Sequence, residues 1–222
     1  MSAPKPASSI REEIKEDLLK AFKDILIKYL DDRTFNENKV KRWINNILED
    51  AKNYFINKYP NYDLFLQCNI YEKNVYFRGH NYSISIVDTD VCDNVSFGGE
   101  NLYSVLYFLA FKSYNLSYSL NEYEDEIIRK GNDILMKYLE DRKFDYDKCT
   151  NYNYNIDDEH CNFILEKEKY SRCHFISEIF QNPIKGKFFY NYFCHGKNIY
   201  SKIIQTYSND SLTCYHYVFF FK

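Results

Sequence analysis

Glycine and proline are scarce in this sequence of 222 residues: 6 Gly and 4 Pro stand against 23 Tyr and 18 Phe. The shortage of glycine argues against an enzyme built on glycine-rich, phosphate-binding loops. Charges nearly balance, with 29 Lys and Arg against 32 Asp and Glu, so the basic surface typical of nucleic-acid-binding proteins is not expected. No run approaches the ~18 consecutive apolar residues that a membrane-spanning helix needs. We therefore expect a globular protein without a membrane segment.

The seven cysteines include no CxxC pair, and their odd number, without an export signal, favours reduced thiols in a cytosolic protein. Histidine and cysteine are neighbours at three places: His160-Cys161, Cys173-His174 and Cys194-His195. Neighbouring residues of a strand point to opposite faces, so one such pair cannot easily hold one metal ion. No glycine-rich or strained-turn motif supports a catalytic thiol–imidazole pair either. We expect no enzyme activity, no metal and no cofactor.

A duplication runs through the chain. Residues 24–35 recur as residues 133–144, and the aligned pairs differ only at Ile27/Met136, Asp31/Glu140 and Thr34/Lys143. At the same spacing residues 70–72 fall on 179–181, and with one inserted residue 101–112 fall on 211–222. We divide the chain into a flexible tail (1–9), a first repeat (10–113), a linker (114–119) and a divergent second repeat (120–222).

Each copy has the pattern of two helices followed by strands, which predicts an α+β fold with antiparallel sheets. In the first copy, helical periodicity covers Ile14 to Tyr29 and about 37–58, with Asn36 as an N-cap. The predicted strands are 64–71, 75–87, 95–97 and 102–111, the last a central one. In the second copy the predicted strands are 175–181, 187–194, 203–207 and 212–221. Its second helix is predicted only from about Asp157, because the preceding Asn-rich segment has low helix propensity.

The first copy resembles a known family. Phe35, Lys39-Val40, Trp43, Asn46 and Glu49 look like the second-helix signature of Tctex-type dynein light chains. The segment 66–74 resembles the first strand of these proteins and its turn, and Leu102-Tyr103 resembles their C-terminal strand. The similarity extends over about residues 10–112 in the order and spacing of the family. The second copy departs from it, with Tyr152 in place of Trp43.

The resemblance implies a fold of two such units, with the helices on one side of each sheet and one strand exchanged between units. We expect one tandem chain to form the whole intramolecular pseudo-dimer, because a short linker holds the copies at high effective concentration. The expected inter-unit interface comprises Trp43, Ile47, Tyr152 and Ile156.

The resemblance also implies a non-catalytic adaptor that binds an extended segment of a dynein intermediate chain or of cargo. Such a segment would add as a strand at a sheet edge, where backbone bonds give affinity and alternating side chains give selectivity. By resemblance this edge is the exchanged strand, about 77–87 in the first copy and 188–195 in the second. The peptide-binding residues expected there are Tyr82, Ile84, Ile86, Phe189 and Tyr192.

Other functions remain open on the sequence alone. The protein could be a scaffold subunit of an assembly unrelated to dynein, or an aromatic-rich module that binds single-stranded nucleic acid by stacking. The charge balance favours neither a nucleic acid nor a membrane as partner. The expected location is cytoplasmic and cytoskeletal, with cytoplasmic and axonemal (ciliary) dynein as open alternatives.

Overall fold

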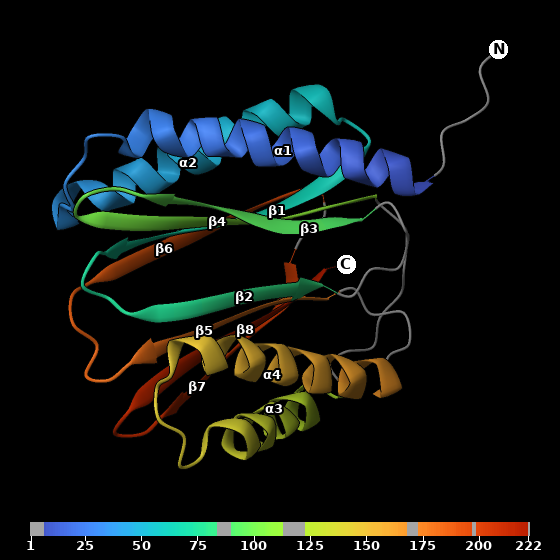
Figure 1. Ribbon diagram of the computed structural model, residues 1–222. Helices are drawn as coiled ribbons and strands as arrows, with labels where there is room; N and C mark the ends of the chain where they lie inside the picture. Colours follow the sequence, from blue (N-terminus) through green and yellow to red (C-terminus); the bar gives the residue numbers. More distant parts are fainter. Residues whose placement is uncertain (1–6, 84–89, 113–122, 168–172, 197–198, 222) are drawn as a thin grey trace. The chain divides into compact units, whose positions relative to one another are not determined.

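The computed structural model describes residues 7–83, 90–112, 123–167, 173–196 and 199–221 (Figure 1). The chain divides into two compact units that do not coincide with the two sequence repeats. Unit 1 comprises Met1–Lys73, Ser85–Tyr114 and Gly186–Asn198, and unit 2 comprises Asn74–Ile84, Asn115–Lys185 and Ile199–Lys222. Each unit thus takes a segment from the other repeat.

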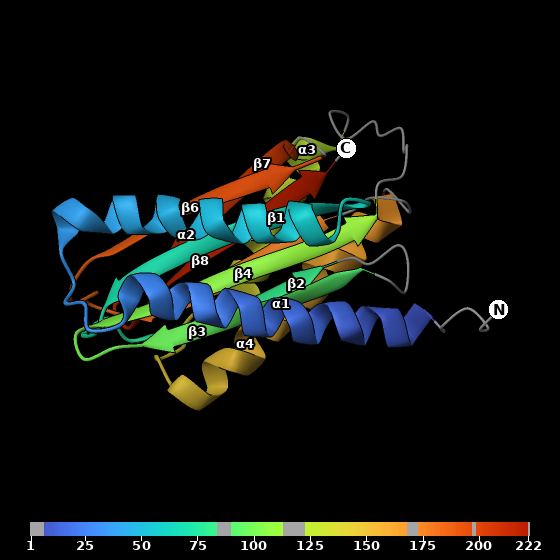
Figure 2. The same ribbon diagram turned by 90° about the horizontal axis from the view of Figure 1, so that it is seen from above.

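Unit 1 has two helices on one face of a four-stranded antiparallel sheet of order β3-β4-β1-β6. Its elements are α1 (Ala7–Leu30), α2 (Glu37–Lys58), β1 (Tyr62–Glu72), β3 (Val91–Gly98), β4 (Leu102–Lys112) and β6 (Phe188–His195). Helix α1 packs along β3, and α2 packs along β1 and β6 (Figure 2). Strand β4 is an interior strand, as the sequence predicts.

Unit 2 repeats this architecture with a sheet of order β2-β5-β8-β7. Its elements are α3 (Glu124–Leu139), α4 (Tyr146–Lys167), β2 (Phe77–Ser83), β5 (Cys173–Gln181), β7 (Ile199–Ser208) and β8 (Leu212–Phe221). Helix α3 packs on β7, and α4 packs on β2 and β5. The two units confirm the predicted α+β fold.

Strand exchange between the repeats is present in both sheets. Strand β6 comes from the second repeat and pairs with β1 of the first, with Phe189 opposite Ile70. Strand β2 comes from the first repeat and pairs with β5 of the second, with Phe77 opposite Phe180. Each exchanged strand lies at the end of its strand order, so each unit presents a strand from the other repeat at a sheet edge.

Helix α2 forms where capping and periodicity agree. The side chain of Asn36 accepts a hydrogen bond from the N–H of Asn38 at 3.1 Å, as expected for an N-cap. Its buried residues recur every three or four positions: Val40, Trp43, Ile44, Ile47, Leu48, Ala51 and Phe55. This apolar stripe packs on the sheet and forms most of the helical side of the unit 1 core.

Helix α4 begins at Tyr146, and the prediction that it starts only near Asp157 is wrong. The carboxylate of Asp145 accepts hydrogen bonds from the N–H groups of Asp147 and Lys148 at 3.1 and 3.2 Å, which caps the helix. The Asn-rich turns are then held by tertiary contacts, since the buried Asn153 donates to the carbonyl of residue 78 in β2 at 2.9 Å. Packing therefore overrides weak intrinsic propensity here.

The turn between the two helices is the same in both units. Asp32 and Asp141, which the repeat aligns, have φ angles of 54° and 58°. These are left-handed conformations in which Asp is one of the better tolerated non-glycine residues. The structural identity of these turns supports the duplication seen in the sequence.

Candidate functional site

The exchanged strands β6 and β2 are the natural positions for an additional strand, because both lie at the end of a sheet. Directly before β6, the carbonyl of Lys187 accepts from the N–H of Glu72 at 2.8 Å, which fixes the phase of the ladder with β1. Antiparallel pairing alternates, so the backbone groups of Phe188, Tyr190 and Tyr192 point away from β1. One of them is already engaged: the N–H of Tyr192 donates to the side chain of Asn191 at 2.9 Å.

Helix α2 runs along the inner side of β6 and is joined to it by polar contacts. Asn191 donates through Nδ2 to Oδ1 of Asn45 at 3.0 Å. At the start of the strand, Lys187 forms an ion pair with Glu37 in the first turn of α2. These contacts involve exposed side chains, so they position the strand more than they stabilise the unit.

Aromatic side chains of β6 that face the helices pack under lysines of α2. The ring of Phe189 lies 6.3 Å from that of Phe35, with the ammonium of Lys41 5.9 Å from its centroid. Phe193 is covered by Lys52 in the same way, at 5.4 Å. Both rings pack against the core of unit 1, so Phe189 anchors the exchanged strand in its own unit.

The side chains of β6 on the face of the sheet away from the helices pack on aromatic residues of β1. The ring of Tyr192 stacks on that of Phe65 at 6.4 Å, and the ring of Phe188 stacks on that of Tyr71 at 5.9 Å. Tyr190 is 40% exposed and is the most accessible large side chain of the strand. The two residues predicted to bind a peptide in β6, Phe189 and Tyr192, therefore lie on opposite faces of the sheet.

The thiol in β6 does not offer nucleophilic chemistry. Burial, together with the neighbouring Asp63, raises the pKa of Cys194 to about 12. The thiol stays protonated at neutral pH, and only the thiolate is a good nucleophile.

At the other edge, β2 is held by α4 through Arg78. Its guanidinium donates from Nε to Oγ1 of Thr150 and from Nη1 to the hydroxyl of Tyr146, both at 2.7 Å. The same group lies 4.2 Å from the centroid of the Tyr146 ring, a cation–π contact. Asn153 also donates to the backbone carbonyl of Arg78, so this residue of β2 is bonded to three residues of α4.

Three predicted site residues fall at or beyond the end of the described part of β2. Tyr82 lies in the strand, opposite Phe175, and its side chain is outside the described part. Ile84 and Ile86 lie outside the described residues.

The four residues predicted at the inter-unit interface each lie in the core of their own unit. Trp43 and Ile47 of α2 are buried in unit 1. Ile156 of α4 is buried in unit 2, and Tyr152 packs against the same cluster. Contact of these residues with the other unit stays a prediction.

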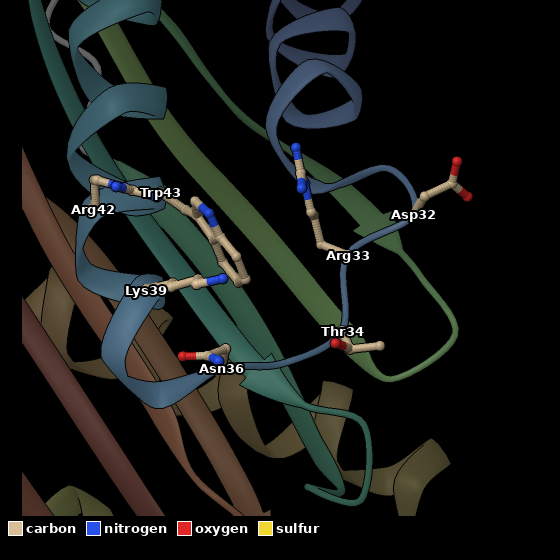
Figure 3. Close-up of a pocket in the computed structure, with 7 residues that line it drawn as sticks. All are labelled: Asp32, Arg33, Thr34, Asn36, Lys39, Arg42 and Trp43. Carbon is tan, nitrogen blue, oxygen red and sulfur yellow. The ribbon is translucent and has the colours of Figure 1, made fainter.

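A depression of about 230 Å³ opens beside the turn between α1 and α2 (Figure 3). Its lining comprises Asp32, Arg33, Thr34, Asn36, Lys39, Arg42 and Trp43. Trp43 is the buried wall, at 7% exposure, and the other side chains are exposed. Figure 3 shows the carboxylate of Asp32 pointing away from Lys39 and Arg42, so the depression carries positive charge.

Sequence reasoning missed a group of buried polar residues in unit 2: Asp157, His160, Ser177 and His216, each with no exposed surface. The repeat alignment places apolar residues or cysteine at the corresponding positions of the first copy: Leu48, Ala51, Cys68 and Leu106. Comparison of the two copies shows Asp157 in place of Leu48, and the same comparison at His160, Ser177 and His216 finds the rest of the group.

Within the part of the chain that the structure describes, none of the helices is both long and apolar enough to cross a membrane. Comparison with curated proteins finds no match to the chain. The model of the Tctex-1 family matches residues 12–110, from α1 through β4, which supports the Tctex-type resemblance of the first repeat.

Proposed function

We propose that the protein is a non-catalytic light chain of a dynein, an adaptor that binds an extended segment of an intermediate chain or of cargo as an added strand. The Tctex-1 match of the first repeat supports the class. The observation that carries the mechanism is the position of β6 and β2 at the ends of their sheets. A cytoskeletal location, with a cytoplasmic or an axonemal motor, follows from this class.

Strand addition suits this edge because the ladder directs alternate backbone groups of β6 outward. Backbone hydrogen bonds to these groups would supply affinity for any extended segment. Selectivity would come from side chains of the segment that alternate between the helix side and the opposite side. On the helix side they would meet the polar and cationic flank of α2, which includes Lys41 and Asn45.

We also propose that a single chain supplies both halves of the pseudo-dimer. The support is the reciprocal exchange of β6 and β2, which already joins the two repeats of one chain. A covalent tether raises the effective concentration of one repeat near the other to the millimolar range, so a second chain is not needed.

Recovery of the native protein with its partners tests the class of function. Affinity-tagged protein purified from its own cells should carry dynein heavy and intermediate chains, identified by mass spectrometry. Their absence under conditions that retain other complexes would refute the dynein assignment. The recovered chain then provides the peptide for the next test.

Proline at Tyr190 tests the binding mode. The N–H of this residue points away from β1, so Tyr190→Pro removes an outward donor and leaves the β1 ladder in place. Loss of one hydrogen bond should raise the dissociation constant of the peptide by about ten-fold, measured by titration calorimetry.

The matched control is Tyr190→Thr, which removes the ring and keeps the N–H. Threonine should bind like the parent; equal weakening in both variants would indicate a side-chain contact instead. If neither variant weakens binding, β6 is not the edge used, and Asn81→Pro, at the outward phase of β2, becomes the deciding variant.

A further inference from the structure

Four polar side chains form a continuous hydrogen-bonded chain between α4 and the sheet of unit 2. Ser177 of β5 donates to Oδ1 of Asp157 at 2.5 Å, and its hydroxyl lies 2.7 Å from Nδ1 of His216 in β8. Nε2 of His216 lies 2.9 Å from Nδ1 of His160, whose Nε2 reaches the carbonyl of Ile127 in α3 at 3.2 Å. The chain therefore joins α3, α4, β5 and β8.

The carbonyl of Ile127, at one end of the hydrogen-bonded chain, determines which nitrogen atoms carry protons. A carbonyl only accepts, so His160 donates from Nε2 to Ile127, and in the neutral ring Nδ1 then accepts. His216 accordingly donates from Nε2 to that nitrogen. The hydroxyl of Ser177 bridges Asp157 Oδ1 and Nδ1 of His216, and that nitrogen also lies 3.4 Å from Asp157 Oδ1.

A proton on Nδ1 of His160 changes this arrangement. That nitrogen becomes a donor facing His216 across 2.9 Å, so His216 must move its own proton to Nδ1, and a positive charge is then buried in a site without exposed surface. The centroids of the two imidazole rings lie only 5.2 Å apart, so two positive rings would also repel. Burial and the adjacent His216 lower the pKa of His160 from 6.5 to about 3.

Burial and His216 outweigh the groups that favour such a proton. The carbonyl of Ile127 and the carboxylate of Asp157 raise the pKa of His160, whereas Lys130 of α3, 3.3 Å from Glu159 of α4, lowers it. Other buried titratable groups on α4, β5 and β8 include Cys161, Cys173, Cys214, Glu178 and the histidine His174. The pKa of the Cys173 and Cys214 thiols is raised by burial, so they stay neutral. Strand β7 contributes the neutral amide of Gln205.

Unit 1 has no such chain at the equivalent place. The repeat alignment matches Asp157 with Leu48 and His160 with Ala51. It also matches the cross-strand pair Ser177 and His216 with Cys68 and Leu106, which are likewise paired across β1 and β4. These four residues of unit 1 belong to its apolar core. The contact of α2 with its sheet in unit 1 is therefore apolar, whereas the contact of α4 with its sheet in unit 2 is built from titratable groups.

We propose that the hydrogen-bonded chain of Asp157, Ser177, His216 and His160 makes unit 2 sensitive to acid. Acidification separates α4 from β5 and β8, while the contact of α2 with its sheet in unit 1 persists. Because Thr150 and Asn153 of α4 hold Arg78 of β2, the same opening loosens the exchanged strand.

Proton linkage at His160 gives the sign and the size of the expected pH effect on the opening of α4. The pKa of His160 in the closed state lies below its value in the open state, so its contribution to stability is complete above pH 6.5 and decreases as the pH falls. With values of about 6.5 open and about 3 closed, the opening constant should rise about 25-fold between pH 7 and pH 5.

Hydrogen exchange of the native full-length chain tests the proposal. Amide exchange, corrected for the intrinsic rate at each pH, should show the protection of α4 and β2 falling about 25-fold from pH 7 to pH 5. Helix α2 is the internal control, because it contains no histidine. Equal loss of protection in α2 and α4, or none in α4, would overturn the proposal.

Two further measurements separate the proton from general instability. Nitrogen NMR of labelled histidine should show the His160 ring neutral, with the proton on Nε2, at pH 5 in the folded protein; ordinary titration near pH 6.5 would refute the model.

His160→Gln keeps one donor and one acceptor without a titrating ring, and should lose the pH response of α4. The combination Asp157→Leu, His160→Ala, Ser177→Cys and His216→Leu, which installs the residues of unit 1, should lose it too; a response unchanged in either folded variant would also refute the model.

Discussion

Replacing Gly131 by alanine tests how α3 packs on β7, because helix propensity and tertiary packing predict opposite signs. In a helix interior, Gly→Ala stabilises by about 1 kcal/mol. Here a Cβ at position 131 would overlap the side-chain amide of Gln205 from β7. That amide donates to the carbonyl of Ile128 at 2.6 Å and to the side chain of Asn132 at 2.8 Å. The close approach explains why glycine occupies the middle of this helix.

The magnitude follows from the bonds that the new methyl group would displace. Moving the Gln205 amide breaks two partly buried hydrogen bonds of about 1 kcal/mol each. Subtracting the propensity gain of about 1 kcal/mol leaves Gly131→Ala destabilising by about 1 kcal/mol. In a Gln205→Ala background the amide is absent, so the same replacement should stabilise by about 1 kcal/mol. The coupling between the two positions is then about 2 kcal/mol.

Urea unfolding of the parent, the two single variants and the double variant, followed by circular dichroism, measures this cycle. The coupling should be unfavourable, and the slope of unfolding free energy against urea should stay constant. If Gly131→Ala stabilises the parent as much as it stabilises Gln205→Ala, the amide of Gln205 does not occupy the space beside α3. The packing argument would then be wrong.

Two other predictions concern the exchanged strands and the assembly. Arg78→Ala removes the bonds from the guanidinium to Thr150 and Tyr146 and should destabilise the chain by about 1–2 kcal/mol in the same urea assay. Arg78→Lys should recover only part of this, because an ammonium does not reproduce the geometry of the fork; full recovery would mean that charge alone docks β2. Light scattering of the purified protein should give the mass of one chain, 26.9 kDa, and a stable mass of two chains would contradict the single-chain pseudo-dimer.

Much of the fold could be predicted because local signals and the duplication agreed. The periodicity of α2 and the Asn36 cap define that helix in the sequence, and the structure confirms both. Strand exchange came only from the family resemblance, since no local pattern says that β6 pairs with a strand more than a hundred residues away. The early start of α4 was missed because Asp145 caps it and packing sustains the Asn-rich turns.

The candidate site was less predictable than the fold. Phe189 and Tyr192, the residues predicted to bind a peptide, both lie in the exchanged strand β6, and the sequence does not tell which side chains of a strand face a helix. The structure puts Phe189 against α2 and Tyr192 on the other face. The buried polar chain was missed for a different reason: Asp157 and His160 look like surface residues of a weak helix until the partners Ser177 and His216 are known.

The exchange of strands changes what duplication can do. Each sheet is completed by the backbone of the other repeat, and ladder hydrogen bonds do not depend on which side chains fill the helix–sheet layer. The residues of that layer can therefore differ between the copies without a change in the pairing that unites them. Leu48 and Ala51 in unit 1 provide an apolar contact that is constant with pH, whereas Asp157 and His160 in unit 2 provide one that depends on protons. A symmetric dimer of identical chains would carry the same contact twice; the tandem chain combines a constant half with a responsive one.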